Sequence, residues 1–238
     1  MTGNQLKILA LITMTVDHIG VVLLPQYLVL RIIGRLTYPI FAYMIAEGCF
    51  YTRDKRRYLG GIFALGAVCQ LGFLIATDSL EQSILTSFVL AIVTIYALQL
   101  ADTRRDVLGV AAVVGAFALD VFVALGLPVL LMGTDFSIDY GFWGIFLPVF
   151  CYLPRIFFKD ALDKQRLRLM FACAAVGIIL VCIQMNAWMG GIQWFSLCAL
   201  VPLACYNGKR GTWRLKYLFY IYYPMHLVLI WGVAVLLK

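Results

Sequence analysis

The chain has two histidines, and both lie inside apolar stretches long enough to cross a membrane. His18 follows Asp17 in TMTVDHIGVVLLP (residues 13–25), and His226 lies in YIYYPMHLVLI (220–230). Ionisable side chains within a bilayer are costly, so they usually face a cavity or a polar partner. A neutral imidazole accepts a proton near pH 7, and an adjacent carboxylate can orient its ring. These residues are therefore candidates for proton transfer.

Four further ionisable residues lie in apolar stretches. Arg35 has the side chain to stabilise an oxyanion or to hold a phosphate. Arg31 and Asp120 lie toward the ends of their stretches, so we expect both to snorkel to the interface. Glu47 lies near the inner end of its stretch, where a packing hydrogen bond and a role in a site are both open.

The depths of these residues are predicted from the helical rise of about 1.5 Å per residue. Asp17 lies eight residues before Pro25 and Arg35 eight residues after Tyr27, so both are about 12 Å from the same membrane face. The short connection PQ makes the two helices antiparallel neighbours. An acid, an imidazole and a guanidinium therefore converge, and the depth of His226, about 15 Å, permits it to join them. A structural ion pair and two packed histidines are the simpler alternatives.

The composition indicates the fold class. Hydrophobic residues make up 63% of the 238 residues and charged residues 13%, and the mean hydropathy is +0.94, whereas soluble domains have about 45–50% apolar and about 25% charged residues. We predict an all-α, polytopic integral membrane bundle of nine or ten helices, since about 20 residues cross a bilayer. The predicted spans are 5–24, 28–51, 58–77, 84–101, 107–126, 141–154, 168–185, 194–206 and 216–237.

Three details of these spans stay open. The short spans 141–154 and 194–206 can extend into neighbouring loops. LPVLLMG (127–133) is too short to cross alone and could be a re-entrant or interfacial segment. No signal-peptide cleavage site follows the first span, so we expect that span to be retained.

The positive charges lie in alternate loops, around residues 53–57, 104–105, 155–168 and 209–216. This distribution predicts that these loops face the cytoplasm, in a multi-pass protein of the cell membrane. The net charge of +7 is therefore interpreted as an orientation signal and not as a nucleic-acid surface. We expect a single domain over residues 1–238. The seven cysteines form no C-x-x-C pair, so they predict neither a metal site nor a disulfide framework.

Sequence motifs narrow the chemistry only in part. No G-x-S-x-G, H-E-x-x-H or Walker motif is present, which argues against serine hydrolase, zinc protease and ATPase functions. A buried histidine with an arginine and a carboxylate fits acyl transfer and proton-coupled transport about equally well.

Several stretches resemble the TraX family. They are TVDHIG (15–20), GRLTYPIFAYMIAEGCFYTRDKRRYL (34–59), DYGFWGI (139–145) and YNGKRGTWRLKYLFYIYYPMHL (206–227). The family is named for a conjugal-transfer protein that N-acetylates pilin, and it is similar to a broader group of polytopic membrane acyltransferases. The resemblance covers most of the chain in the same order.

The resemblance implies acyl transfer from cytoplasmic acyl-CoA, with acetyl-CoA as the expected donor. The acceptor would be an extracytoplasmic amine or hydroxyl on a peptide N-terminus, a glycan or a small molecule. His18 would be the general base, with Asp17, Arg35 and His226 in the same catalytic site. The expected cofactor-binding residues, near the cytoplasmic entrance, are Glu47, Lys55, Arg56, Arg57, Lys209 and Arg210.

Two other functions remain open from the residues alone. One is a proton-coupled transporter in which Asp17, His18 and Glu47 form a relay. The other is a non-catalytic membrane assembly factor in which the polar side chains hold helices together.

Overall fold

A computed structural model describes residues 1–159, 162–212 and 216–237, and their regular elements are all helices. Residues 213–215, part of the last TraX-like stretch and of the predicted basic loop, lie outside this description. Seven helices are long and apolar enough to cross a membrane: Gly3–Val22, Leu28–Tyr51, Lys55–Thr77, Ile84–Arg104, Val107–Leu130, Lys164–Trp188 and Leu218–Leu236. Two shorter apolar helices, Gly141–Phe157 and Gly190–Ala204, lie where the two short spans were predicted. The prediction of an all-α membrane bundle is confirmed.

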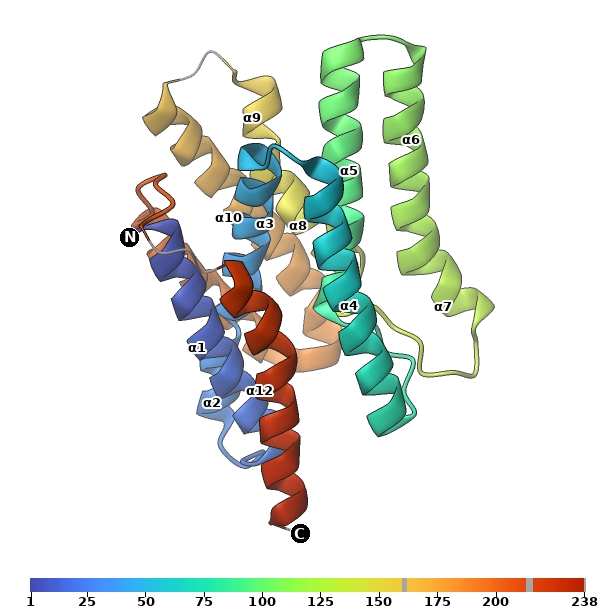
Figure 1. The fold of residues 1–238 in the computed structure, drawn as a ribbon, viewed down its shortest axis with the longest axis vertical. Helices are drawn as coiled ribbons and strands as arrows, with labels where there is room; N and C mark the ends of the chain where they lie inside the picture. The colour runs from blue at the N-terminus through green and yellow to red at the C-terminus, as the bar shows by residue number, and fades with distance from the viewer. Residues whose placement is uncertain (160–161, 213–215, 238) are drawn as a thin grey trace. The chain divides into compact units, whose positions relative to one another are not determined.

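The segment after residue 126 differs from its prediction. α6 (Val107–Val121) continues through a π-helical turn, η1 (Phe122–Gly126), into α7 (Leu127–Leu130). Residues 127–130 are thus the end of one apolar helix, and the re-entrant interpretation is wrong. Figure 1 shows the continuous path from α6 to α7.

The chain divides into two compact units, Met1–Phe41 with Met185–Lys238, and Ala42–Gln184. We call them the terminal unit and the central unit. The terminal unit contains α1 (Gly3–Val22), α2 (Leu28–Gly34), the start of α3 (Thr37–Tyr51), the end of α10 (Asp163–Met189), η2 (Gly190–Ala199), α11 (Leu200–Ala204) and α12 (Lys216–Leu236).

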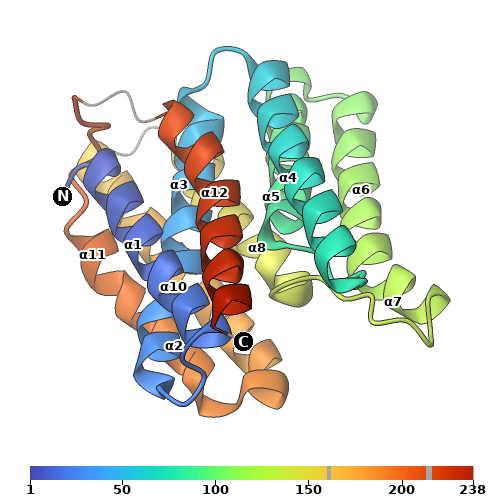
Figure 2. The same cartoon turned by 60° about the horizontal axis from the view of Figure 1, so that its bottom comes forward.

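In the terminal unit, α1 packs against both α2 and α12, and Figures 1 and 2 both show α12 beside α1. Small residues let helices approach closely in membranes. Gly20 of α1 is such a residue, because a Cβ there would lie 2.7 Å from the Cβ of Leu30 on α2. Nearer the N-terminus of α1, the hydroxyls of Thr13 and of Thr37, the first residue of α3, are hydrogen-bonded at 2.8 Å.

The predicted second span is interrupted between α2 and α3, at Arg35 and Leu36. The cause is in the sequence. Pro39 has no N–H to donate to the carbonyl of Arg35, and a proline ring clashes with that carbonyl in a continuous helix. The interruption places Arg35 at a helix end inside the membrane span.

The central unit is built around α5 (Ile84–Arg104), which packs against α4 (Lys55–Thr77), α6 and α8 (Gly141–Tyr152). Figure 1 shows α5 and α6 side by side. The short α9 (Pro154–Phe157) follows α8. Side chains of α5 and α8 form the interior, where Ile92, Ile95 and Ile145 are each 0% exposed.

Asp120 of α6 is buried, with 0% exposure, so the prediction that it snorkels to the interface is wrong. The hydroxyl of Thr94 on α5 donates a 2.6 Å hydrogen bond to Oδ2 of Asp120. The predicted span ended at residue 126, but the helix continues to Leu130. That extension puts Asp120 about 15 Å from the helix end, too deep for this short side chain to reach the interface.

The variant Thr94→Val should destabilise the protein by about 1–2 kcal/mol, because it removes the hydrogen bond and leaves a buried carboxyl oxygen without a donor. Unfolding in mixed micelles at increasing denaturant measures this change. Thr77→Val is the matched control, since the Thr77 hydroxyl bonds only the Phe73 carbonyl of its own helix. Equal unfolding midpoints for the two variants would contradict the prediction.

Candidate functional site

Asp17 on α1 is held by two arginines of the following segment. Nη2 of Arg35 donates to Oδ1 and Oδ2 of Asp17, both at 3.0 Å. Nη1 of Arg31 lies 2.8 Å from Oδ1 of the same carboxylate. The predicted neighbourhood of Asp17 and Arg35 is thus observed, whereas the expectation that Arg31 snorkels is wrong. Arg31 lies one helical turn before Arg35, so both guanidinium groups reach the same carboxylate.

Arg35 is 3% exposed and has two more partners in the terminal unit. Its Nε donates to the carbonyl of Arg31 at 3.2 Å, and its Nη1 donates to Oε1 of Gln193 at 3.3 Å. Gln193, in η2, is 0% exposed. Gln193 was not predicted as a site residue, because it falls in the connection between the predicted spans 168–185 and 194–206. The signal was a glutamine directly before an apolar stretch.

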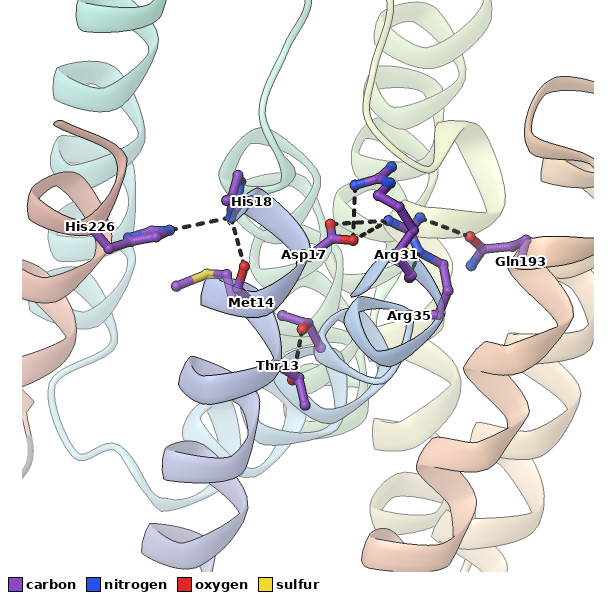
Figure 3. Close-up of polar contacts among 9 residues, drawn as sticks. Thr13, Met14, Asp17, His18, Arg31, Arg35, Gln193 and His226 are labelled. Atoms are coloured by element: carbon purple, nitrogen blue, oxygen red, sulfur yellow. Dashed lines mark hydrogen bonds and ion pairs between the residues drawn. The ribbon is translucent and has the colours of Figure 1, made fainter. Parts of the chain in front are cut away.

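His18 and His226 face each other across α1 and α12. Nδ1 of His18 lies 3.3 Å from Nε2 of His226, and the ring centroids are 5.0 Å apart in an edge-to-face arrangement. Figure 3 shows the two rings pointing toward one another from their helices. The expectation that the depth of His226 lets it join His18 is therefore met.

The hydrogen bonds of the two rings determine which nitrogens carry protons. Nδ1 of His18 lies 2.9 Å from the Met14 carbonyl, and Nδ1 of His226 lies 2.9 Å from the Tyr222 carbonyl. A carbonyl only accepts, so each neutral ring carries its proton on Nδ1. Nε2 of His226 then accepts from His18. Among the described residues, no protein group bonds Nε2 of His18, and this nitrogen keeps its lone pair.

Tyr222 holds α12 in register with α1. Its hydroxyl is hydrogen-bonded at 2.7 Å to the hydroxyl of Thr15, one turn before His18. Its ring also stacks on His226, with centroids 5.4 Å apart and an interplanar angle of 9°. This pair of contacts fixes the imidazole of His226 against His18, and the sequence alone gave no sign of it.

The four predicted catalytic residues thus lie in one unit but form two clusters. Figure 3 shows Asp17 directed toward the arginines and His18 toward His226, on adjacent faces of α1. The charges of Asp17, Arg31 and Arg35 still lie close enough to act on the His18 ring.

Glu47 belongs to the central unit, whereas the two clusters belong to the terminal unit. It is 3% exposed and forms an ion pair with Arg155, which is 5% exposed. The guanidinium of Arg155 also lies over the ring of Phe50, 3.7 Å from its centroid. The carboxylate of Glu47 therefore serves first to hold a buried arginine.

The predicted phosphate-binding cations are found in three different settings. Lys55, at the start of α4, lines a cavity of about 510 Å³ in the central unit. Arg56 and Arg57 are exposed beside it and do not line that cavity. Lys209 and Arg210 are exposed in the terminal unit, where their carbonyls accept from the first amides of α1 at 2.8 and 2.9 Å. Their backbone caps a helix, which a sequence motif does not reveal.

Comparison with known proteins gives the family context. A family model described as TraX protein matches residues 2–234. The chain is similar to the "Probable fimbrial assembly protein FimC, serogroup H1" of Dichelobacter nodosus, with 28% identity over 98% of this chain and 96% of the relative. It is 38% identical to an uncharacterized protein of Rickettsia prowazekii (strain Madrid E), over 37% of this chain and 32% of the relative. No solved structure matches the chain.

Proposed function

The chain belongs to the TraX family, and from this premise we propose that it is a membrane-embedded acyltransferase. It takes an acyl group, acetyl in the simplest case, from acyl-CoA on the cytoplasmic side of the cell membrane. It transfers this group to an amine or a hydroxyl on the extracytoplasmic side. The family resemblance supports the reaction class, and the histidine pair supports a chemical role for the site.

The observation that carries the proposal is the hydrogen bonding of His18. The Met14 carbonyl and His226 both bond Nδ1, which leaves the lone pair on Nε2. A base oriented in this way is prepared to take a proton from a nucleophile.

The step balances with one proton transferred through His18. The acceptor amine or hydroxyl attacks the thioester carbonyl, and a C–N or C–O bond forms while the proton of the acceptor passes to Nε2 of His18. The C–S bond then breaks, and the proton passes from Nε2 to the thiolate, giving free CoA. His226 accepts the Nδ1–H of His18 and stabilises the imidazolium formed between these events.

Asp17 and its two arginines act beside this base. Three side chains of net charge +1 (two arginines and one carboxylate) give a positive potential near His18, which stabilises a developing oxyanion. Gln193 keeps the Arg35 guanidinium in one orientation through its 3.3 Å contact. Arg35 is therefore the oxyanion-stabilising group in this proposal, and Asp17 orients it.

The acceptor is suggested by the relative and by charge. The name of the relative refers to fimbrial assembly, so an amine of a fimbrial or pilin subunit is the first acceptor to test. In this proposal the basic loops face the cytoplasm, and the first helix runs from that face toward Val22. His18 then lies in the extracytoplasmic half, where an exported acceptor can arrive.

No observation favours the transporter alternative. Its relay would need Asp17, His18 and Glu47, but Asp17 is ion-paired with arginines. Glu47 belongs to the central unit, where it is ion-paired with Arg155. The acyltransferase uses these same contacts without requiring either carboxylate to exchange a proton.

Purified protein in nanodiscs should release free CoA thiol from acetyl-CoA when an acceptor is present. A set of a peptide amine, an amino sugar and a simple alcohol tests the acceptor class, and mass spectrometry of the acceptor locates the acyl group. Protein-free nanodiscs give the background hydrolysis. Thiol release at the background rate with all three classes, by a protein that unfolds cooperatively, would remove the proposal.

A further inference from the structure

A second polar site lies in the central unit, at the end that carries its basic loops. It is a cavity of about 510 Å³, within the usual range for small-molecule sites. Six helices (α3, α4, α5, α8, α9 and α10) and their connections contribute to its walls. The lining residues are Cys49, Phe50, Thr52, Lys55, Gln99, Asp102, Thr103, Tyr152, Arg155, Ile156, Lys159 and Arg166.

The charge of this cavity is positive. Lys55, Arg155, Lys159 and Arg166 line it against one acid, Asp102, which gives four minus one, or +3. Glu47 behind the wall lowers this to +2 through its pair with Arg155. Lys159 and Asp102 form an ion pair at the rim, where they are 45% and 26% exposed. An excess of cations in a concave site attracts anions.

Arg155 is built into the wall of the cavity and is not a mobile surface group. It is 5% exposed, Glu47 pairs with its Nη2, and Phe50 lies against its guanidinium plane. Its Nε is buried and has no hydrogen-bond partner among the described residues. A buried arginine N–H usually has an acceptor, and a ligand oxygen would supply one here.

Hydroxyl and amide groups hold the lining in place, and the hydroxyls of Thr52 and Thr103 donate to the carbonyls of Asp54 and Gln99. Thr52, Gln99 and Thr103 line the cavity beside the cations. The amide of Gln99 donates to Tyr152 at 2.6 Å and to the Cys49 carbonyl at 3.2 Å. The walls of the cavity are thereby fixed to one another. Preformed walls with guanidinium and ammonium donors suit the several oxygens of a phosphate.

We propose that this cavity binds the phosphate-bearing nucleotide end of the acyl-CoA donor, with Lys55 and Arg155 as its central contacts. The inference rests on the proposed function, because it assigns the donor's phosphates to these residues. Of the cations predicted to bind the donor, Lys55 lines this cavity, and Arg56, Arg57, Lys209 and Arg210 do not. Glu47 acts here as a positioning residue for Arg155.

The test uses Lys55→Gln in the full-length protein in phosphatidylcholine nanodiscs. Lys55 is exposed, so its loss should not unfold the helix. The dissociation constant of CoA, measured by calorimetry, should rise about tenfold, and KM for acetyl-CoA should rise with it while kcat stays within about twofold. Arg53→Gln removes the same charge two residues away, outside the cavity, and should leave both constants unchanged.

Each outcome supports or overturns a separate statement. CoA binding that is equal in Lys55→Gln and wild type would overturn this site and leave the acyltransferase proposal standing. Wild-type protein that binds no CoA would overturn both. Nanodiscs with phosphatidylglycerol test the other source of phosphate. If that lipid, and not CoA, stabilises wild type but not Lys55→Gln, the cavity binds a lipid headgroup and the assignment to the donor is wrong.

Discussion

Replacing His18 by glutamine should lower kcat/KM for acyl transfer by about 10²- to 10⁴-fold, the usual contribution of a general base. Glutamine keeps much of the volume and can still donate to the Met14 carbonyl, but it has no nitrogen lone pair to take a proton. The loss should therefore appear in kcat more than in KM. Thiol release from acetyl-CoA, followed in nanodiscs, measures it.

His226→Gln separates the base from its neighbour. The side-chain carbonyl of glutamine can still accept from Nδ1 of His18, so we expect a smaller loss of about 10- to 100-fold, as for groups that orient a catalytic residue. Both variants should unfold at the wild-type temperature. Wild-type turnover by a folded His18→Gln protein would contradict the mechanism, and so would a larger loss in His226→Gln than in His18→Gln.

The pH profile gives an independent test of the same base. An imidazolium has no lone pair, so kcat/KM should fall as the pH is lowered through the titration of the histidine pair. The acid limb should disappear in the residual activity of His18→Gln. Persistence of that limb would assign the titration to another group.

The sequence predicted the contact between Asp17 and Arg35 for a physical reason. Their equal spacing from a short connection predicts the same depth on two neighbouring helices, because both helices rise by the same amount per residue. The same reasoning gave a depth for His226 but not its neighbour. Only the structure shows that Thr15 and Tyr222 set the register in which His226 reaches His18.

Other contacts could not be predicted because the helices are apolar on every side. A periodic polar face tells which side of a helix is buried, but α6 offers almost no polar residues besides Asp120. Its partner on α5 was therefore hidden. The pair of Glu47 with Arg155 joins residues 108 positions apart, and nothing local to either residue indicates the other.

The break at Arg35 was readable in principle, since Pro39 forbids the hydrogen bond that a continuous helix needs there. The apolar stretch 28–51 is long enough to cross a membrane, so it was predicted as one continuous helix. The consequence is functional in our proposal. At this helix end, Arg35 contacts both Asp17 and Gln193. The spacing of residues along a straight helix does not predict these two contacts together.

Gly34→Ala should be the most damaging small substitution in the terminal unit. A Cβ at this position would lie 2.1 Å from Oδ1 and 2.3 Å from both Cβ and Cγ of Asp17. These atoms are next to the backbone of α1, so they cannot move aside by a rotamer change alone. Either α1 and α2 separate or the Asp17 carboxylate leaves Arg35. We expect a loss of about 1–3 kcal/mol in the free energy of unfolding, the usual cost of overpacking.

Gly115→Ala is the matched control, because nothing lies within 4 Å of a Cβ at Gly115 in α6. Alanine is the better helix former by about 1 kcal/mol, so this variant should be neutral or slightly more stable. Unfolding midpoints of the two variants measure the difference without any assay of activity. If Gly34→Ala retained wild-type stability, the close approach of α1 to α2 would be wrong. If it lost stability but kept full turnover, the Asp17–Arg35 pair would be a structural contact and not part of the reaction.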